Sequence, residues 1–216
     1  MTKTVIMWSG GADSTLIVDE MLRNTTDELI LHHIVFKSDV VEDSKKLYIQ
    51  RHNLTASAQL VALKQIDDYW KQEGYRPFTL DIIYYQHSFQ GGGHGIAAPI
   101  FGIRAIRKYN ADRFITGHRN AGDGRYGYQK YPTKEHKILF ELEMQYDATG
   151  NSKPSNVKWE RPLSHLNRGN KMMIAEQLPP ALRELVVTCD YPTTYGDHWV
   201  RCYECIRCKD WPSYYI

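Results

Sequence analysis

The sequence predicts an α/β fold with a doubly wound, mainly parallel sheet, helices on both faces of that sheet, and a small C-terminal helical and metal-binding region. Three observations support this prediction. Strand-like and helix-like apolar segments alternate over residues 4–116, the first strand is followed by a loop rich in glycine and serine, and all four cysteines lie beyond residue 188. Alternating strands and helices are typical of parallel sheets, because each connecting helix packs back onto the sheet.

Each element is expected from the spacing of its apolar residues. Short apolar runs predict buried strands, and apolar residues three and four positions apart predict helices. The longest helix has Leu54, Ala58 and Val61 on one face, a charged loop at 37–46 precedes it, and Gly74 ends it. The expected strands are 4–8, 28–36, 78–84 and 113–116, and the expected helices are 13–23, 47–73 and 97–109.

The composition is that of a folded protein and is compatible with a nucleotide-sized ligand. The 216 residues are 42% hydrophobic, which is enough for a full core. We expect one compact unit made of an α/β core, residues 1–150, and a C-terminal extension, residues 151–216. The net charge of +2 argues against a surface that wraps a long nucleic acid. No stretch is long enough to span a membrane and no signal-peptide pattern is present, so we expect a cytoplasmic protein without a membrane partner.

The loop Ser9-Gly10-Gly11-Ala12-Asp13-Ser14 joins the first expected strand to the first helix. Glycines let backbone N–H groups approach a ligand, the serines add hydroxyl donors, and the N-terminus of the helix favours an anion. The sequence therefore predicts a phosphate site, which lacks the motifs of Walker loops and dinucleotide binders. The alternative is a tight turn in which Asp13 only caps the helix.

The cysteines form the pattern C-x12-C-x2-C-x2-C, with ligands Cys189, Cys202, Cys205 and Cys208. This spacing suits one tetrahedral zinc ion and is a poor pattern for disulfides in a reducing compartment. Four protein thiolates leave no open position for a catalytic water, so the site is expected to be structural. Free or redox-active thiols are the alternative.

The glycine-serine loop resembles the SGG-x-DS signature of the PP-loop ATP pyrophosphatases, which have a HUP-like fold. Together with the four cysteines it is similar to the 7-cyano-7-deazaguanine synthase (QueC) family. Further segments resemble that family in the same order along the chain. They are Gln50-Arg51-His52, Phe114–Gly117 with Asp123, Arg161-Pro162-Leu163 before a lysine-bearing helix, and Thr188-Cys189.

This resemblance implies an ATP-dependent carbon–nitrogen ligase of queuosine biosynthesis. Such an enzyme adenylates 7-carboxy-7-deazaguanine, uses ammonia to form an amide, and activates the amide with a second ATP to leave a nitrile. It releases AMP and pyrophosphate, uses Mg²⁺ and Zn²⁺, and is commonly a homodimer.

The resemblance also implies roles for individual residues. Asp13 would position magnesium, and either Lys171 or Arg168 would neutralise phosphate charge. The residues that would bind ATP are Ser9, Gly10, Gly11, Asp13, Ser14 and Thr15, and those that would contact the deazaguanine are Arg51, His94, Gly117 and Asp123.

Three segments depart from the pattern of the family: the insertion at 37–46, Gln90–Gly95 and Tyr131–Lys134. They lie where the family recognises its substrate, so two alternatives stay open. A diverged enzyme would stop at the amide or transfer the acyl group to another amine, on a protein or nucleic acid, and a silent module would bind ATP without turnover. His94 and His118 are candidate substrate contacts or proton carriers, or else surface histidines.

Overall fold

The computed structural model describes residues 1–37, 46–86, 94–118, 157–166, 171–209 and 211. Its centre is a five-stranded sheet in the order β3-β2-β1-β4-β5, and every neighbouring pair is parallel. The predicted α/β fold is therefore confirmed. The strands are β1 (Lys3–Met7), β2 (Glu28–Lys37), β3 (Thr79–Gln86), β4 (Arg113–Thr116) and β5 (Lys158–Glu160).

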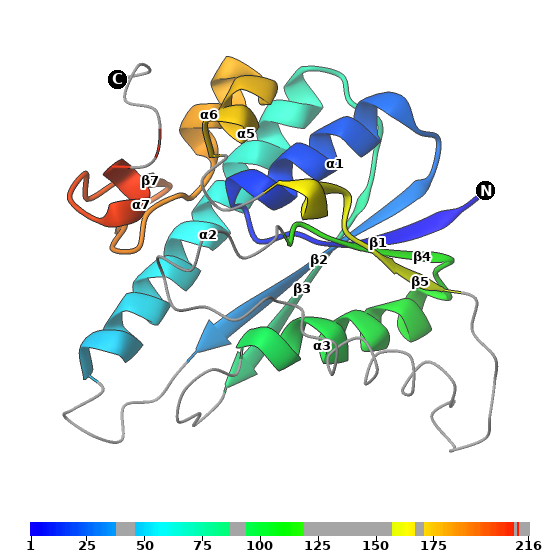
Figure 1. Cartoon of the computed structure of the whole chain (residues 1–216), viewed down its shortest axis with the longest axis horizontal. Helices are drawn as coiled ribbons and strands as arrows, with labels where there is room; N and C mark the ends of the chain where they lie inside the picture. The colour runs from blue at the N-terminus through cyan, green and yellow to red at the C-terminus, as the bar shows by residue number, and fades with distance from the viewer. Residues whose placement is uncertain (38–45, 87–93, 119–156, 167–170, 210, 212–216) are drawn as a thin grey trace.

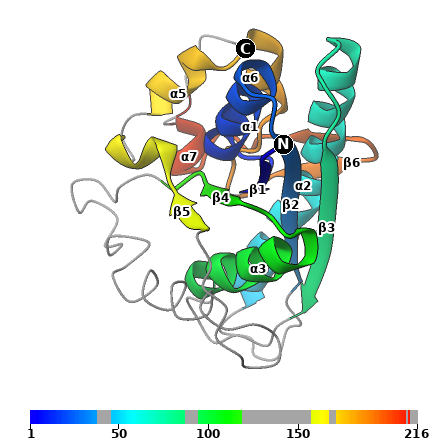
Figure 2. The ribbon, with the colours of Figure 1, turned by 90° about the vertical axis from the view of Figure 1, so that its right-hand side faces the viewer.

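Helices cover both faces of the sheet (Figures 1 and 2). Helices α1 (Ala12–Asn24) and α2 (Lys46–Gln72) lie on one face, and α3 (His94–Tyr109) lies on the other. Alternate residues of β1 show the two layers, because Ile6 packs into the cluster with α1 and α2 while Val5 packs into the cluster with α3. Side chains of a strand point alternately to opposite faces, so both sides of β1 are buried.

The strand order places a site at one end of the sheet. From β1 the chain runs outward to β2 and β3, then returns through α3 to β4 on the other side of β1. The carboxyl ends of β1 and β4 are neighbours at this reversal. Ligands of open α/β sheets bind at such a point, because the connections diverge there and leave a crevice.

The C-terminal part packs on the α1 and α2 side. The short helices α5 (Lys171–Gln177) and α6 (Pro180–Leu185) contact α1 and α2, respectively. A hairpin of β6 (Thr193–Tyr195) and β7 (His198–Val200) also lies on α2. The remaining elements are the 3₁₀ helix η2 (Pro162–His165), which follows β5, and α7 (Ile206–Lys209), which lies among the cysteines.

Most element boundaries fall close to the predicted ones. The third helix begins at His94 rather than residue 97, and the third strand is Thr79–Gln86 rather than 78–84. Strand β5 was not predicted, because three residues are too few for a periodic pattern. It lies beyond residue 150 yet completes the sheet, and the division of the chain at that position stays a prediction. Within the described residues, no helix is long and apolar enough to span a membrane.

Candidate nucleotide-binding site and metal centre

The glycine-serine loop lies at the carboxyl end of β1 and is pressed against α2. Gly10 has a φ of +70°, a left-handed conformation that favours glycine. A Cβ on Gly10 would lie 3.4 Å from the Gln59 carbonyl oxygen and 3.6 Å from the Ala62 Cβ. The turn therefore depends on glycine at this position, whereas both α2 atoms lie at ordinary van der Waals distance from the Cβ position.

Hydrogen bonds among the two serines fix the shape of the loop. The Ser9 N–H donates to the Ser14 Oγ at 3.2 Å, and the two hydroxyl oxygens are also 3.2 Å apart. The Gly11 N–H donates to the Ser9 Oγ at 3.3 Å. Ser14 is buried and Ser9 is exposed, so Ser14 holds the loop from inside while Ser9 presents its hydroxyl at the surface.

Helix α1 begins directly at this loop. Gly11 is its N-cap residue without a side-chain cap, and the Thr15 N–H donates to the Gly11 carbonyl at 3.0 Å. Asp13 lies in the first turn, and Gly11 rather than Asp13 occupies the N-cap position. An uncapped N-terminus leaves backbone N–H groups and a positive potential for an anion.

Thr15 has a different environment from the serines. Its side chain is fully buried, and its Oγ1 accepts a hydrogen bond from the Trp8 Nε1 at 3.0 Å. The hydroxyl therefore links the helix to the core. A contact between Thr15 and a nucleotide stays a prediction.

Gly117 joins the end of β4 to the same loop. A Cβ on Gly117 would lie 3.0 Å from the Ser14 backbone nitrogen and 3.2 Å from the Asp13 carbonyl carbon. The sequence predicted Gly117 as a substrate contact, and the structure places it against the first turn of α1. This close contact brings the segment after β4 beside the candidate phosphate site.

The remaining predicted contacts are only partly described. Arg51 lies in α2, His94 is the first residue of α3, and Lys171 is the first residue of α5, but their side chains are not described. Because α5 packs on α1, Lys171 lies in an element next to the loop helix. Arg168 and Asp123, and the divergent segments 37–46, Gln90–Gly95 and Tyr131–Lys134, fall wholly or largely outside the described residues.

A strap of the C-terminal part, which we define as residues 186–190, runs across the glycine-serine loop. The Val187 N–H donates to the Gly10 carbonyl at 2.9 Å, and the Gly11 Cβ position is 3.6 Å from the Val187 carbonyl oxygen. The strap then continues to the first cysteine, Cys189. No local sequence pattern predicts this contact, because its two sides lie near opposite ends of the chain.

The four cysteines of the C-terminal pattern come together. The Sγ atoms of Cys189, Cys202, Cys205 and Cys208 all lie within 4.8 Å of one another, and none forms a disulfide. In a tetrahedral site with metal–sulfur distances of about 2.3 Å, the sulfur atoms lie about 3.8 Å from one another. The cluster of four Sγ atoms therefore has the size that a single ion requires. A four-iron cluster would insert its own atoms between the thiolates and separate them further.

Backbone N–H groups surround the sulfur atoms. The Cys189 Sγ accepts from the N–H groups of Tyr191 and Cys202, each at 3.3 Å. Burial raises the pKa of the Cys189 thiol to about 11. Burial also opposes ionisation of Cys205, but N–H groups of Asp190 and Cys208 outweigh it and lower the pKa of Cys205 to about 7. Such N–H donors stabilise thiolates, the form that binds a metal.

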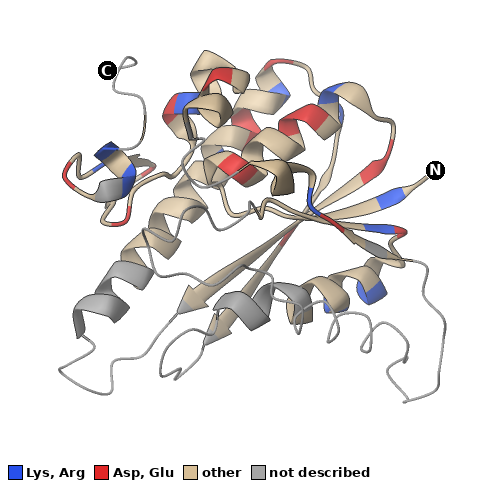
Figure 3. Ribbon diagram, in the orientation of Figure 1, with Lys and Arg blue, Asp and Glu red and all other residues tan. Residues whose placement is uncertain are grey.

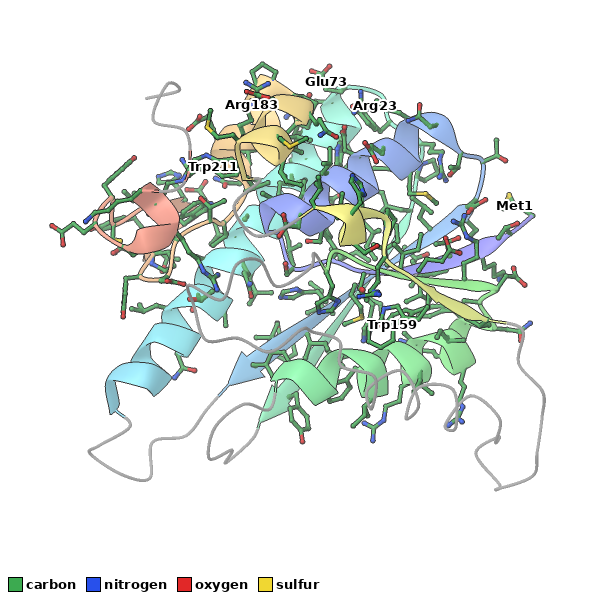
Figure 4. The ribbon with its side chains drawn as sticks, in the orientation of Figure 1. Met1, Arg23, Glu73, Trp159, Arg183 and Trp211 are labelled. Atoms are coloured by element: carbon green, nitrogen blue, oxygen red, sulfur yellow. The ribbon has the colours of Figure 1, made fainter. Side chains whose placement is uncertain are left out.

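Arg201 fastens the cysteine-bearing segment to the strap and to α6. Its guanidinium donates to the Arg183 carbonyl at 2.9 Å and to the Thr188 Oγ1 at 3.3 Å. It also lies over the Trp199 ring, 5.2 Å from the centroid. Trp199 and Trp211 are 9% and 5% exposed, so these aromatic residues pack rather than offer an open surface. Figure 4 shows Trp211 next to the cysteine-bearing segment.

Two buried histidines of β2 lie near the site and were not predicted. The His33 Nδ1 is 2.9 Å from the carbonyl oxygen of Trp8, the residue before the loop, and burial lowers the pKa of His33 to about 4. His33 is therefore neutral at pH 7 and donates from Nδ1 to that carbonyl. The His32 Nδ1 is 2.8 Å from Asp81, on the α3 side. The signal in the sequence was a His-His pair inside an apolar strand.

Comparisons with known proteins identify no family. Neither a protein-family model nor a curated protein matches the chain. One aligned structure is the U34-tRNA thiolase NcsA from Methanococcus maripaludis with its 4Fe-4S cluster, at 15% identity and a TM-score of 0.47, and the alignment covers 97% of this chain and 63% of the thiolase. Another is a predicted subunit of tRNA methyltransferase from Methanocaldococcus jannaschii, at 14% identity and a TM-score of 0.35, and the alignment covers 82% of this chain and 75% of that chain. Both TM-scores are below 0.5, and no statement about the activity of this chain follows from either structure.

Proposed function

We propose that the chain is an adenylating enzyme of the PP-loop ATP pyrophosphatase type. The observation that carries this proposal is the position of the Ser9–Ser14 loop. It lies at the reversal of strand order, where the carboxyl ends of β1 and β4 meet the uncapped N-terminus of α1. A sheet of this kind binds ligands at this end, and a glycine-rich turn before a helix favours phosphate.

The residues of the loop suit the charge that develops in adenylation. A carboxylate oxygen attacks the α-phosphorus of ATP, the bond to the β-phosphate breaks, and pyrophosphate leaves with the electron pair. The N–H groups of the first turn of α1 and the Ser9 hydroxyl would stabilise the leaving pyrophosphate. Magnesium would supply further charge neutralisation, and Asp13 in the first turn is the residue proposed to position it.

The proposed substrate is 7-carboxy-7-deazaguanine, with ammonia as the second substrate and the nitrile as the product. The ordered resemblance to the 7-cyano-7-deazaguanine synthase family supports this choice. Charges of both signs are mixed on α6 and around α7 (Figure 3), which favours a small-molecule substrate over a nucleic acid backbone at these elements. We propose a homodimer on the same resemblance.

The proposed metal at the cysteines is zinc in a structural role. Four thiolates within 4.8 Å of one another match the donor set and size of a tetrahedral zinc site. Zinc would hold the cysteine-bearing segment in one conformation. Because the strap joins this segment to the loop through the hydrogen bond from the Val187 N–H to the Gly10 carbonyl, zinc would also help to fix the position of the loop.

The first experiment incubates the purified chain with ATP, Mg²⁺, ammonium and 7-carboxy-7-deazaguanine, and follows AMP and the deazapurine product by mass spectrometry. AMP with a nitrile supports the synthase. AMP with only an amide or a trapped adenylate supports the diverged enzyme and directs the search to another amine acceptor. No AMP contradicts the proposed activity with this substrate.

Two serine variants test the loop itself. Ser14→Ala removes the buried hydroxyl that the Ser9 N–H and hydroxyl contact, and we expect AMP formation to fall by about 100-fold. Ser57→Ala is the matched control, because Ser57 is exposed on α2 and its hydroxyl donates only to the Asn53 carbonyl of its own helix. Equal activity of the two variants would exclude the loop as the ATP site.

A further inference from the structure

Arg201 has a largely buried side chain between the cysteine-bearing segment and the strap. It follows β7 and directly precedes Cys202, one of the four clustered cysteines. Its side chain is only 9% exposed, and its guanidinium carbon lies 5.2 Å from the centroid of the Trp199 ring and 5.9 Å from that of Trp211. Two indole rings therefore attract the cation and restrict its position.

Arg201 and Trp199 supply hydrogen bonds at the carboxyl end of α6. The last carbonyls of a helix have no partner within the helix and need one from elsewhere. The Arg201 guanidinium donates to the carbonyls of Arg183, which lies on α6 (Figure 4), and Val186, at 2.9 Å and 3.5 Å. The Trp199 Nε1 donates to the Leu185 carbonyl at 3.1 Å. These two side chains therefore fix the point at which the chain leaves α6 and enters the strap.

The same guanidinium contacts the strap on both sides of Val187. It reaches the Val186 carbonyl, and the Arg201 Nε donates to the Thr188 Oγ1 at 3.3 Å. Thr188 is 7% exposed, so water competes little for this contact. The residue between them, Val187, is the one whose N–H donates to the Gly10 carbonyl at 2.9 Å. Arg201 thus holds the strap at the two positions that flank this N–H.

The bond from Val187 fixes one peptide unit of the glycine-serine loop. A peptide unit is planar, so the Gly10 carbonyl and the Gly11 N–H form one rigid group and point in opposite directions. Neither glycine has a side chain to restrict the rotation of this unit. The Gly11 N–H donates to the Ser9 Oγ at 3.3 Å. The orientation of the peptide therefore sets the position of the Ser9 hydroxyl, which is proposed to contact the leaving pyrophosphate.

We propose that Arg201 is a positioning residue for the nucleotide, because through the strap it fixes the Gly10–Gly11 peptide and the Ser9 hydroxyl before ATP binds. This inference rests on the proposed function. The guanidinium bonds described above reach the strap and α6, so Arg201 acts through Val187 rather than on ATP. Groups that are already in place bind a ligand without a cost of ordering. Lysine cannot replace Arg201, because an ammonium lacks the planar fork that donates in several fixed directions.

Two substitutions of Arg201 and one matched control test this role. Arg201→Met keeps an aliphatic stem and removes the donors, and we expect the Kd for ATP from calorimetry and the KM for ATP to rise by about tenfold. Arg201→Lys keeps the charge and is expected to weaken ATP binding by nearly as much. Lys209→Met is the control, because Lys209 is exposed and directly follows Cys208, just as Arg201 directly precedes Cys202.

A change in KM separates positioning from a general loss of stability. A less stable variant contains fewer active molecules, which lowers the apparent kcat and leaves the KM for ATP unchanged, whereas a misplaced loop raises the KM. Elemental analysis gives the metal content, and only samples with the same content as the wild type are compared. Should Arg201→Met lose its metal, Arg201→Lys and Thr188→Val take its place, since Thr188→Val removes only the acceptor in the strap.

Amide hydrogen exchange measured by NMR follows the strap directly and needs neither ATP nor activity. The Val187 amide is expected to exchange about tenfold faster or more in Arg201→Met and Arg201→Lys, because its bond to Gly10 opens more often. In Lys209→Met its exchange rate is expected to stay at the wild-type value.

The outcomes distinguish this inference from the proposed function. A wild-type protein that neither forms AMP nor binds ATP contradicts the proposed function. An active wild type, with unchanged ATP affinity in both Arg201 variants, overturns the role of Arg201 alone. Unchanged exchange of the Val187 amide in both variants overturns the action of Arg201 through the strap, whatever the activity.

Discussion

The glycine-serine loop and the cysteine cluster are two candidate binding sites that the protein stabilises in different ways. The loop is made by the fold itself: a buried strand, two helices and hydrogen bonds at 3.2–3.3 Å hold its backbone. The cysteine-bearing segment has short elements, a two-stranded hairpin and a four-residue helix, around four thiols. We therefore expect the loop to be formed before a ligand binds, and the cysteine-bearing segment to depend on a bound metal for its order.

The strongest test of this comparison is to remove Cys205, one of the four proposed metal ligands. Cys205→Ser is expected to abolish the bound metal, counted by elemental analysis, and to cost about 3 kcal/mol of stability, a shift of roughly 6–12 °C in the unfolding midpoint. Glu204→Gln is the control, because residue 204 lies between two cysteines and is not a predicted ligand. An unchanged midpoint after metal loss would mean that the segment is ordered without metal.

The second prediction concerns the loss of stability in acid that His33 causes through its contact with Trp8, the residue before the loop. The pKa of His33 is about 4 in the folded chain and about 6.5 when unfolded, so the unfolded chain binds more protons between these values. Stability is therefore full above pH 6.5 and falls as the pH decreases toward 4, by about 3 kcal/mol in total from this group. His33→Asn keeps a donor for the Trp8 carbonyl and removes the titration.

Urea unfolding across this pH window measures the effect. The variant is expected to lose less stability than the wild type between pH 6.5 and pH 4, and metal-free samples of both remove the contribution of the cysteines. Parallel curves for the two proteins would show that His33 does not carry the acid sensitivity of the loop region.

The third prediction tests the contact between the loop helix and β4. Gly117→Ala puts a Cβ 3.0 Å from the Ser14 backbone nitrogen, and backbone on both sides must shift. We expect a loss of about 2 kcal/mol in unfolding free energy and weaker ATP binding by calorimetry. An unchanged unfolding free energy together with an unchanged ATP affinity would mean that the backbone at this end of the sheet can shift without a loss of free energy.

The smallest effect separates backbone strain from packing at the loop. Gly10 and Gly74 have similar φ values, +70° and +73°, but only Gly10 has neighbours within 4 Å of its Cβ position. Gly74→Ala is expected to cost about 1 kcal/mol from backbone strain, and Gly10→Ala about the same, because the α2 atoms nearest to its Cβ position lie at ordinary van der Waals distance. A clearly larger loss of unfolding free energy for Gly10→Ala than for Gly74→Ala would show that contact with α2 adds crowding to the backbone strain.

The sequence predicted local features well. The apolar spacing located four strands and three helices of the core, because each of them buries at least one face over many residues. The Ser9–Ser14 loop and the cysteine pattern were predicted as sites since their spacing carries the chemistry. In the structure the loop lies at the reversal of strand order and the four thiols come together.

Features that depend on distant pairing were not predicted. Strand β5 is recognisable only by its pairing with β4, and the Val187 bond to Gly10 joins two segments with no shared pattern. The hydrogen bond from the Trp159 Nε1 to the Thr116 hydroxyl, which also contacts the His118 Nδ1, likewise forms only when β5 lies beside β4. Periodicity describes one segment at a time, so such contacts require the tertiary structure.

The strap has a consequence for synthesis of the chain on the ribosome. The Ser9–Ser14 loop is made well before its partner Val187, because more than 170 residues separate them along the chain. Contacts between segments so far apart form late, because a long loop must close before they contribute. A nascent chain that has released the first four strands would still lack the strap over Gly10. The nucleotide affinity proposed for the loop should therefore emerge in full only after Val187 has left the ribosome.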